Sequence, residues 1–401
     1  MLSDERSRTV GLGWVGVALL VTSWLVTRAV LFADTFSGQT PLDVVAYQRW
    51  ANGILEGISP AADTAFVYPP GGNVIFLMTE VISGEGFFRT FTLLALLSDF
   101  AILVALLRFG MAKAAGAQFP VGPWVWVLMG FVAGPLMYQR FDVFAALMAV
   151  LAVLLVARPA LSGAFAGLGL LVKLWPEITL LALPRHRLMR GLIANVITVV
   201  VGWLVLHVWM GDSLGFLSNV VNKGLSVEAV AAYPFLVSRA LFSSHGVTGQ
   251  YGSWEVIGPG VPLAATISTV VGVVLLLGLF VARLRGRLEK AAPGDIVLLG
   301  VLIFVVTHKI NSLQYGIWIA AMTATALAFS SSRARGPAVL LTLMLIVADQ
   351  VIWTYFVDFI SGNPLFLVFQ GLRLLLLLAA TIWLALEIFR RGSPEPRGSR
   401  L

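Results

Sequence analysis

Apolar stretches separated by short charged loops run along the whole chain. Six of them are close to the roughly 20 residues that an α-helix needs to cross a bilayer. They are Val10–Phe32, Phe87–Leu107, Leu192–Met210, Pro262–Ala282, Ala338–Phe356 and Leu365–Ile388. Shorter apolar stretches lie between them, interrupted at Pro135, Lys173 and Pro176. The pattern predicts an all-α polytopic integral membrane protein with roughly 10–13 membrane helices.

Composition agrees with this prediction. Hydrophobic residues make up 59% of the chain and charged residues 12%, against about 45–50% and about 25% in soluble proteins. The first apolar stretch is too long for a signal-peptide core and lacks a small-x-small cleavage site, so we expect a retained anchor. The chain has no cysteine, which excludes disulfides, thiolate metal sites and thiol catalysis.

The distribution of Lys and Arg predicts the orientation. When both termini are placed in the cytoplasm, 18 of the 27 cations fall in cytoplasmic loops or the tail, as the positive-inside rule requires. We therefore expect a multi-pass plasma-membrane protein with both termini cytoplasmic. The net charge of +7 follows from this topology and from contact with membrane lipids, so no nucleic-acid partner is expected.

A single transmembrane domain is expected over residues 1–390. Its first half, 1–190, holds most of the chemically informative residues. The second half, 191–390, is more variable and contains an outer loop at 211–261. Residues 391–401 are rich in Pro, Gly, Ser and Arg, which predicts a disordered cytoplasmic tail.

The first outer loop, Thr40 to Gly72, carries acids and aromatic residues between two apolar stretches. If Pro41 opens a helix, Asp43, Tyr47 and Trp50 share one face. A carboxylate beside two aromatic rings suits a sugar acceptor. Two other interpretations remain open: Asp43 caps the helix together with Thr40, or the rings lie at the membrane interface.

Nine cations remain outside, several of them beside apolar stretches where an unpaired charge is costly: Arg28, Arg49, Arg89, Arg140, Lys173, Lys223, Arg239, Lys309 and Arg373. An anionic ligand such as a lipid phosphate would satisfy them. The alternative is internal pairing, expected as Arg140 with Asp142, Lys173 with Glu177, and Arg28 with Asp99.

A polar interruption of two apolar stretches also faces outward, and such breaks commonly line substrate sites. It consists of His308, Lys309, Asn311, Ser312, Gln314 and Tyr315. Asp99 and Asp349 lie inside apolar stretches, where a buried hydrogen bond is as good an explanation as function, and we assign them no catalytic role. Gly163, Gly167 and Gly169 are expected to allow close helix packing rather than to bind phosphate.

Three blocks carry a family resemblance. The pattern Asp43, Tyr47, Gly57, Pro60, Asp63 and Tyr68-Pro69-Pro70 resembles the first extracytoplasmic loop of GT-C membrane glycosyltransferases, specifically glycosyltransferase family 87. Arg140 to Pro184 is similar to that family's Arg-Phe-Asp hairpin, Gly-rich helix and Lys-Leu-Trp-Pro. It also resembles the mannosyltransferase of GPI-anchor assembly.

The third block resembles the family's Lys-x-x-Ser-x-Gln-Tyr-x-x-Trp segment through Lys309, Ser312, Gln314, Tyr315 and Trp318. A weaker match in the outer loop includes Gly224, Leu225 and Glu228, whereas Lys223 and Ser226 depart from the family. Ala61 and Val67 in the first loop also depart from it, which bears on acceptor specificity.

The resemblance implies a GT-C fold whose outer first loop carries short amphipathic helices. It implies an inverting enzyme that transfers a sugar, most often mannose, from polyprenyl phosphate to a glycolipid or lipoglycan on the extracytoplasmic face. Asp43 would be the general base. Cations at the outer ends of membrane segments could bind the donor phosphate, and these are Lys173, His308, Lys309 and Arg140.

Residues expected to contact the sugar or acceptor are Tyr47, Trp50, Asp63, Tyr68, Glu228, Gln314 and Tyr315. No obligatory cofactor or metal is expected, because the first loop has no Asp-x-Asp pair. Two alternatives stay open: transfer of another lipid-linked sugar such as arabinofuranose, and a transporter or flippase of an anionic lipid. Polar residues concentrated on one side of the membrane favour the enzyme.

Overall fold

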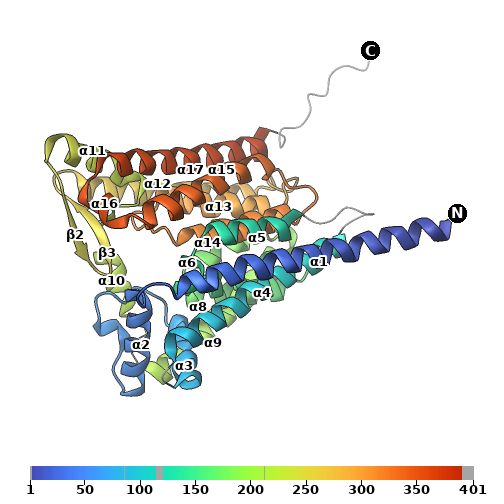
Figure 1. Cartoon of the computed structure of the whole chain (residues 1–401), viewed down its shortest axis with the longest axis horizontal. Coiled ribbons are helices and arrows are strands. Elements are labelled where there is room, and N and C mark those ends of the chain that lie inside the picture. The colour runs from blue at the N-terminus through green and yellow to red at the C-terminus, as the bar shows by residue number, and fades with distance from the viewer. Residues whose placement is uncertain (1, 85, 114–120, 212, 391–401) are drawn as a thin grey trace, which may run out of the picture.

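A computed structural model describes residues 2–84, 86–113, 121–211 and 213–390, which form a helical bundle (Figure 1). Within these described ranges, six helices are long and apolar enough to cross a membrane. They are α1 (Leu2–Thr35), α4 (Phe87–Lys113), α9 (Arg185–Met210), α12 (Val261–Leu284), α15 (Arg335–Ile346) with its π-helical continuation η4 (Val347–Trp353), and α17 (Pro364–Arg390). Each coincides with a predicted apolar stretch, which confirms the all-α polytopic class.

Shorter apolar helices lie among the long ones. They are α3 (Gly71–Ser83), α5 (Val121–Val132), α7 (Asp142–Leu154), α8 (Pro159–Val172), η3 (Val230–Ala232) continuing into α11 (Tyr233–Phe242), α13 (Pro293–Thr307) and α14 (Tyr315–Leu327). A helix of 13 residues is about 20 Å long, less than the roughly 30 Å hydrocarbon layer. The chain therefore breaks its helices inside the bundle.

The breaks lie where the sequence predicted interruptions. Pro135 is the N-cap of the one-turn helix α6 (Leu136–Gln139). Lys173 ends α8, and Pro176 begins the 3₁₀ helix η2 (Trp175–Ala182). Irregular backbone at membrane depth is tolerated only where protein buries it or where it lines a cavity.

Small residues allow close helix packing in the centre of the bundle. Every residue of α14 is buried, and α5, α7 and α13 pack around it. Helices α8 and α9 approach closely at Gly163, where an added Cβ would be 2.0 Å from the carbonyl oxygen of Gly191. This contact confirms the packing interpretation of the glycine run.

The two loops that the sequence predicts to face outward, called the outer loops below, cover one end of the bundle (Figure 1). The start of α1 and the end of α17 both point toward the opposite end, away from these loops (Figure 1). The first loop folds into α2 (Leu42–Leu55) and η1 (Pro60–Ala62). The start of α1 and the end of α17 are thus on the same side of the bundle, whereas the prediction that this side is cytoplasmic stays a prediction. The expected disordered tail, 391–401, is outside the described residues.

The second outer loop contains α10 (Phe216–Asn222) and a small sheet that the sequence did not predict. The sheet has the antiparallel order β1-β3-β2, from β1 (Leu225–Ser226), β3 (Ser253–Ile257) and β2 (Gly246–Gln250). Val256 pairs with Leu225 on one side and Val247 on the other. Much later in the chain, the short helix α16 (Phe356–Ser361) lies at the same end of the bundle (Figure 1).

The side-chain amide of Asn219 links the two outer loops. The side-chain nitrogen of Asn219 donates to the carbonyl oxygens of Ala61 (3.3 Å), Asp63 (3.1 Å) and Phe66 (2.9 Å). The second half of the chain therefore helps to fix the position of the first loop.

Candidate active site

Asp43 forms an ion pair with Arg140. The carboxylate comes from the first turn of α2, and the guanidinium from the extended residue that follows α6. The side chain of Asp43 is 31% exposed and that of Arg140 is 12% exposed. The predicted pairing of Arg140 with Asp142 is wrong, because the backbone turn points Arg140 toward the first loop.

The capping interpretation of Asp43 is also wrong. Helix α2 begins after Pro41, as predicted, but its N-cap is Pro41 itself and no side chain caps it. Thr40 lies outside the cap position, and the Asp43 carboxylate is directed at Arg140 instead. The partly exposed carboxylate of Asp43 is therefore held by an ion pair rather than by its own helix end.

Lys173 pairs with Asp142, 2.7 Å from Nζ to Oδ1. The indole Nε1 of Trp318 donates to the same oxygen at 2.6 Å. The predicted pair of Lys173 with Glu177 is wrong, since Glu177 accepts from the amide of Asn195 at 3.0 Å. The backbone is extended at Lys173, which places its side chain away from the residues one turn ahead.

Aromatic rings surround the Lys173 ammonium. Its Nζ lies 4.4 Å from the ring centre of Phe141, 5.2 Å from that of Tyr68 and 5.6 Å from that of Trp318. These rings come from the α6–α7 turn, the first loop and α14. Cation–π contacts stabilise a desolvated ammonium, so Lys173 connects three segments that are distant in sequence.

Tyr47 and Trp50 share the Asp43 face of α2, as predicted, but their rings are buried. Tyr47 stacks on Phe76 with ring centres 4.5 Å apart, and Trp50 meets Phe66 edge-on at 5.1 Å. Tyr47 is 0% and Trp50 5% exposed. The aromatic cluster therefore covers most of both rings, although Trp50 also borders a groove on the first loop; contact of Tyr47 and Trp50 with the sugar or acceptor stays a prediction.

Asp63 organises the first loop. It forms an ion pair with Arg49, accepts from Trp50 Nε1 at 2.9 Å, and accepts from the Ala65 amide at 2.9 Å. Burial alone would raise the pKa of Asp63, but these hydrogen bonds and the charge of Arg49 lower it below its ordinary value. The structure thus gives the predicted acceptor residue Asp63 a folding role.

Glu228 and Lys223 add charge from the second outer loop. Burial raises the pKa of Glu228 to about 7, against the charges of Arg373 and Lys223. Burial lowers the pKa of Lys223 to about 8, although Glu255 and Glu228 oppose it. Arg373 donates to the backbone carbonyl of Glu228 at 2.5 Å. The charge of Arg140 also acts on Glu228, and that of Asp43 on Lys223, so both belong to one polar region.

The predicted polar break between α13 and α14 is tied to the second outer loop. Lys309 Nζ donates to the carbonyls of Val221 (3.1 Å) and Lys223 (2.6 Å), at the end of α10. His308 Nδ1 donates to the carbonyl of Ile310, and its ring stacks on Phe304 with centres 4.5 Å apart. In this structure both side chains hold the break together.

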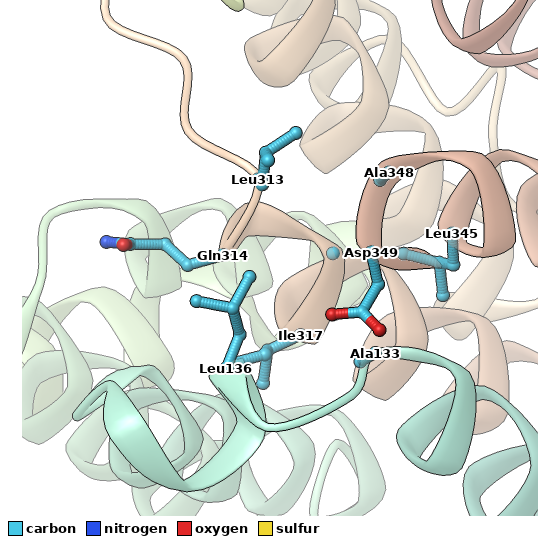
Figure 2. A pocket seen from close by; sticks show the side chains of 9 residues that line it. Ala133, Leu136, Leu313, Gln314, Ile317, Leu345, Ala348 and Asp349 are labelled. Carbon is cyan, nitrogen blue, oxygen red and sulfur yellow. The ribbon is translucent and has the colours of Figure 1, made fainter. Parts of the chain in front are cut away.

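Tyr315 and Gln314 complete that break. Tyr315 stacks on Trp318 with ring centres 3.7 Å apart, so it borders the Lys173 cluster. Gln314 is buried at the start of α14 and its amide points away from the cavity beside Asp349 (Figure 2).

The two carboxylates inside apolar stretches are both outside this region. Asp99 pairs with Arg28 (2.8 Å), as predicted, and accepts from Tyr138 (2.7 Å) and Trp24 (3.2 Å). Asp349 lies in η4 beside a cavity of about 10 Å³, roughly the space of one water, lined mainly by apolar side chains (Figure 2). Its Oδ2 accepts from Gln350 at 2.6 Å.

Two residues of the site were not predicted. Trp318 belongs to the resemblance motif, yet only the structure shows that it binds Asp142. Trp353, at the end of η4, lies beneath Arg140 with the guanidinium carbon 5.9 Å from a ring centre. No sequence signal marks Trp353, because its contact depends on the π-helical backbone.

The site is therefore built where helices break. The first loop supplies Asp43, the α6–α7 turn supplies Arg140, and the end of α8 supplies Lys173. Among the described residues no three His, Asp or Glu side chains are grouped to hold a metal, and the prediction of no obligatory metal stays a prediction.

Comparison with known proteins identifies the family. The family model of glycosyltransferase family 87 matches residues 66–308, more than half of the chain, and this range includes Tyr68, Arg140, Lys173 and Glu228. No curated protein matches the chain. The match, together with the helical membrane fold, shows a membrane glycosyltransferase: the chain belongs to glycosyltransferase family 87.

Proposed function

We propose that the protein is an inverting glycosyltransferase that takes mannose from a polyprenyl-phosphate donor at the extracytoplasmic face. The acceptor is a glycolipid or lipoglycan. The observation that carries the proposal is the contact between Asp43 and Arg140. A partly exposed carboxylate lies beside a cation at the end of the bundle that carries the two loops, and this arrangement supports a site for the phosphate of a lipid-linked donor.

Asp43 acts as the general base. An acceptor hydroxyl gives its proton to the Asp43 carboxylate while its oxygen forms a bond to the anomeric carbon of the donor sugar. The bond between that carbon and the phosphate oxygen breaks on the opposite face, and polyprenyl phosphate leaves with the electron pair. Attack opposite to the leaving group inverts the configuration at that carbon.

Arg140 is the cation best suited to the leaving phosphate. Its Nε is buried and has no hydrogen-bond partner among the described residues, so a phosphate oxygen would satisfy this donor if donor binding moves the groups that cover it. A positive group held at the site of developing charge stabilises the transition state. Because the guanidinium also holds Asp43, it places base and leaving group in a fixed relation.

Lys173 has a different part in the proposal from the one that the sequence indicated. Its ammonium is already neutralised by Asp142 and covered by aromatic rings. We assign it to positioning the α6–α7 turn that carries Arg140. The apolar sides of the bundle hold the polyprenyl chain in the lipid, and the outer loops cover the reacting sugar.

The experiment is sugar transfer in vesicles. Purified protein is reconstituted with radiolabelled polyprenyl-phosphate mannose and an envelope-lipid extract, in parallel with polyprenyl-phosphate arabinofuranose. Labelled glycolipid or lipoglycan from the mannose donor supports the proposal. Product from the arabinofuranose donor but not from the mannose donor would show that the enzyme transfers arabinofuranose, and the proposed reaction type would stand. Movement of a fluorescent anionic lipid between leaflets, without product from either donor, favours a flippase.

A further inference from the structure

A groove of about 550 Å³ lies on the first outer loop, between one face of α2 and the segment that leads into η1. Its lining includes Gln48, Arg49, Asn52, Glu56, Ser59 and Asp63. Ligand pockets commonly have volumes of about 300–1,000 Å³. The mechanism proposed above makes no use of this groove.

The groove is on the side of α2 opposite to the catalytic acid. Arg49, Asn52 and Glu56 follow one another at helical spacing, and in an α-helix they lie about half a turn from Asp43 and Tyr47. Asp43 and Tyr47 face the bundle, whereas the groove residues Asn52 and Glu56 are exposed. The helix thus presents two distinct polar surfaces.

The groove lining suits a sugar chain. Planar amide, carboxylate and guanidinium groups can each donate or accept hydrogen bonds, and Asn52 and Glu56 have no side-chain hydrogen bond within the described part of the chain. Val45 and Ile58 add apolar surface, 47% and 55% exposed. Ligand sites commonly combine apolar lining with a few placed polar groups.

Charge indicates that the ligand is neutral. Arg49 is already paired with Asp63, which leaves Glu56 as a carboxylate without a cationic partner among the described residues. A phosphate or an anionic lipid headgroup would meet this negative charge at close range. Neutral hydroxyl groups have no such cost and can donate to a carboxylate.

The groove walls are held in place without a ligand. Asp63 is fixed by Arg49, Trp50 and the Ala65 amide, and Asn219 of the second outer loop binds three carbonyls of the same segment. A preformed site loses little conformational entropy on binding. The groove and the Asp43 site are therefore joined by one rigid helix.

We infer that this groove binds a neutral oligosaccharide portion of the acceptor, several sugars away from the hydroxyl that receives the new residue. The inference rests on the proposed function and refines it, because it favours a lipoglycan with a sugar chain over a glycolipid with a short head. Chain length, rather than the terminal sugar alone, would then set acceptor affinity.

The test measures binding of neutral manno- and arabino-oligosaccharides, of two and of six sugars, to the full-length protein in detergent by saturation-transfer NMR. The double variant Asn52→Ala with Glu56→Ala removes two groove groups that have no structural partner. Gln250→Ala, an exposed polar change at the end of β2, is the matched control. We expect the native chain and the control to bind a hexasaccharide more tightly than a disaccharide.

The double variant should bind the hexasaccharide about tenfold more weakly, since lost hydrogen bonds worth 1.4 kcal/mol together correspond to a factor of ten. Asp43→Asn should keep binding, which separates this inference from the catalytic proposal. Equal binding by native and double variant, or no binding of any neutral oligosaccharide by the native chain, would overturn it. Displacement by inorganic phosphate would do so as well, because it would mean that the site takes anions.

Discussion

The buried pair of Lys173 and Asp142 makes a sharp prediction about stability. The Asp142 side chain is 0% and that of Lys173 7% exposed, and Nζ lies 2.7 Å from Oδ1. Asp142→Asn or Lys173→Met each leaves one charge buried without its partner, which costs about 3–5 kcal/mol. Replacing both removes the charges together, so most of the loss should be recovered in the double variant.

The assay is the apparent Tm of the purified protein in detergent, followed by tryptophan fluorescence. Each single variant should unfold at a clearly lower temperature than the native chain, and the double variant should lie between the singles and the native chain. Additive losses in the double variant would refute the reasoning, because independent sites add and a buried ion pair does not.

Transfer activity of the same double variant separates positioning from phosphate binding. If Lys173 only positions the turn that carries Arg140, transfer should recover together with the Tm. The alternative outcome is that the Tm of the double variant recovers while its transfer rate stays about 10²-fold or more below the native rate, which is the loss expected for one electrostatic donor. That result would mean that Lys173 contacts the leaving phosphate, as the sequence indicated. The interpretation of Lys173 given above would then be wrong.

Three further predictions concern single positions. Because burial raises the pKa of Glu228 to about 7, the folded state binds a proton more tightly than the unfolded chain. The stability of the protein should therefore fall as the pH rises from about 4.5 to 7. Glu228→Gln should remove this fall from a plot of Tm against pH. Gly134→Ala should lower the Tm, since φ is +65° and the new Cβ would lie 2.2 Å from the Asp349 carboxylate, with a backbone cost of about 1–2 kcal/mol; an unchanged Tm would contradict the geometry. Gly163→Leu should separate α8 from α9 and reduce the folded yield, whereas the outward-facing Leu168→Ala should not.

Much of the fold could be predicted because lipid imposes a simple rule. A segment that crosses the bilayer must be apolar and must satisfy its own backbone hydrogen bonds, so the long helices coincide with the apolar stretches. The helix breaks at Pro135 and Lys173 could also be predicted, because a proline or a charge interrupts an apolar stretch there. The three-stranded sheet was not, because its strands are only two to five residues long and depend on pairing across the second outer loop.

The sequence predicted several residues of the site but not which of them form ion pairs. Asp43 and Arg140 were both singled out, yet neighbours in sequence suggested the wrong partners for Arg140 and Lys173. Each side chain leaves the backbone at a helix break, where φ and ψ follow no regular pattern, so spacing cannot show its direction. The burial of Tyr47 likewise depends on Phe76 and Phe141, which come from other elements.

The measurement that tests the central claim most directly is the initial rate of mannose transfer by Asp43→Asn relative to the native chain. Asp358→Asn, an exposed acid in the first turn of α16, serves as the matched control. Loss of a general base lowers the rate by about 10²–10⁴-fold, so we expect this fall for Asp43→Asn at an unchanged Tm, with the control near the native rate. Transfer by Asp43→Asn at the native rate would show that Asp43 is not the base.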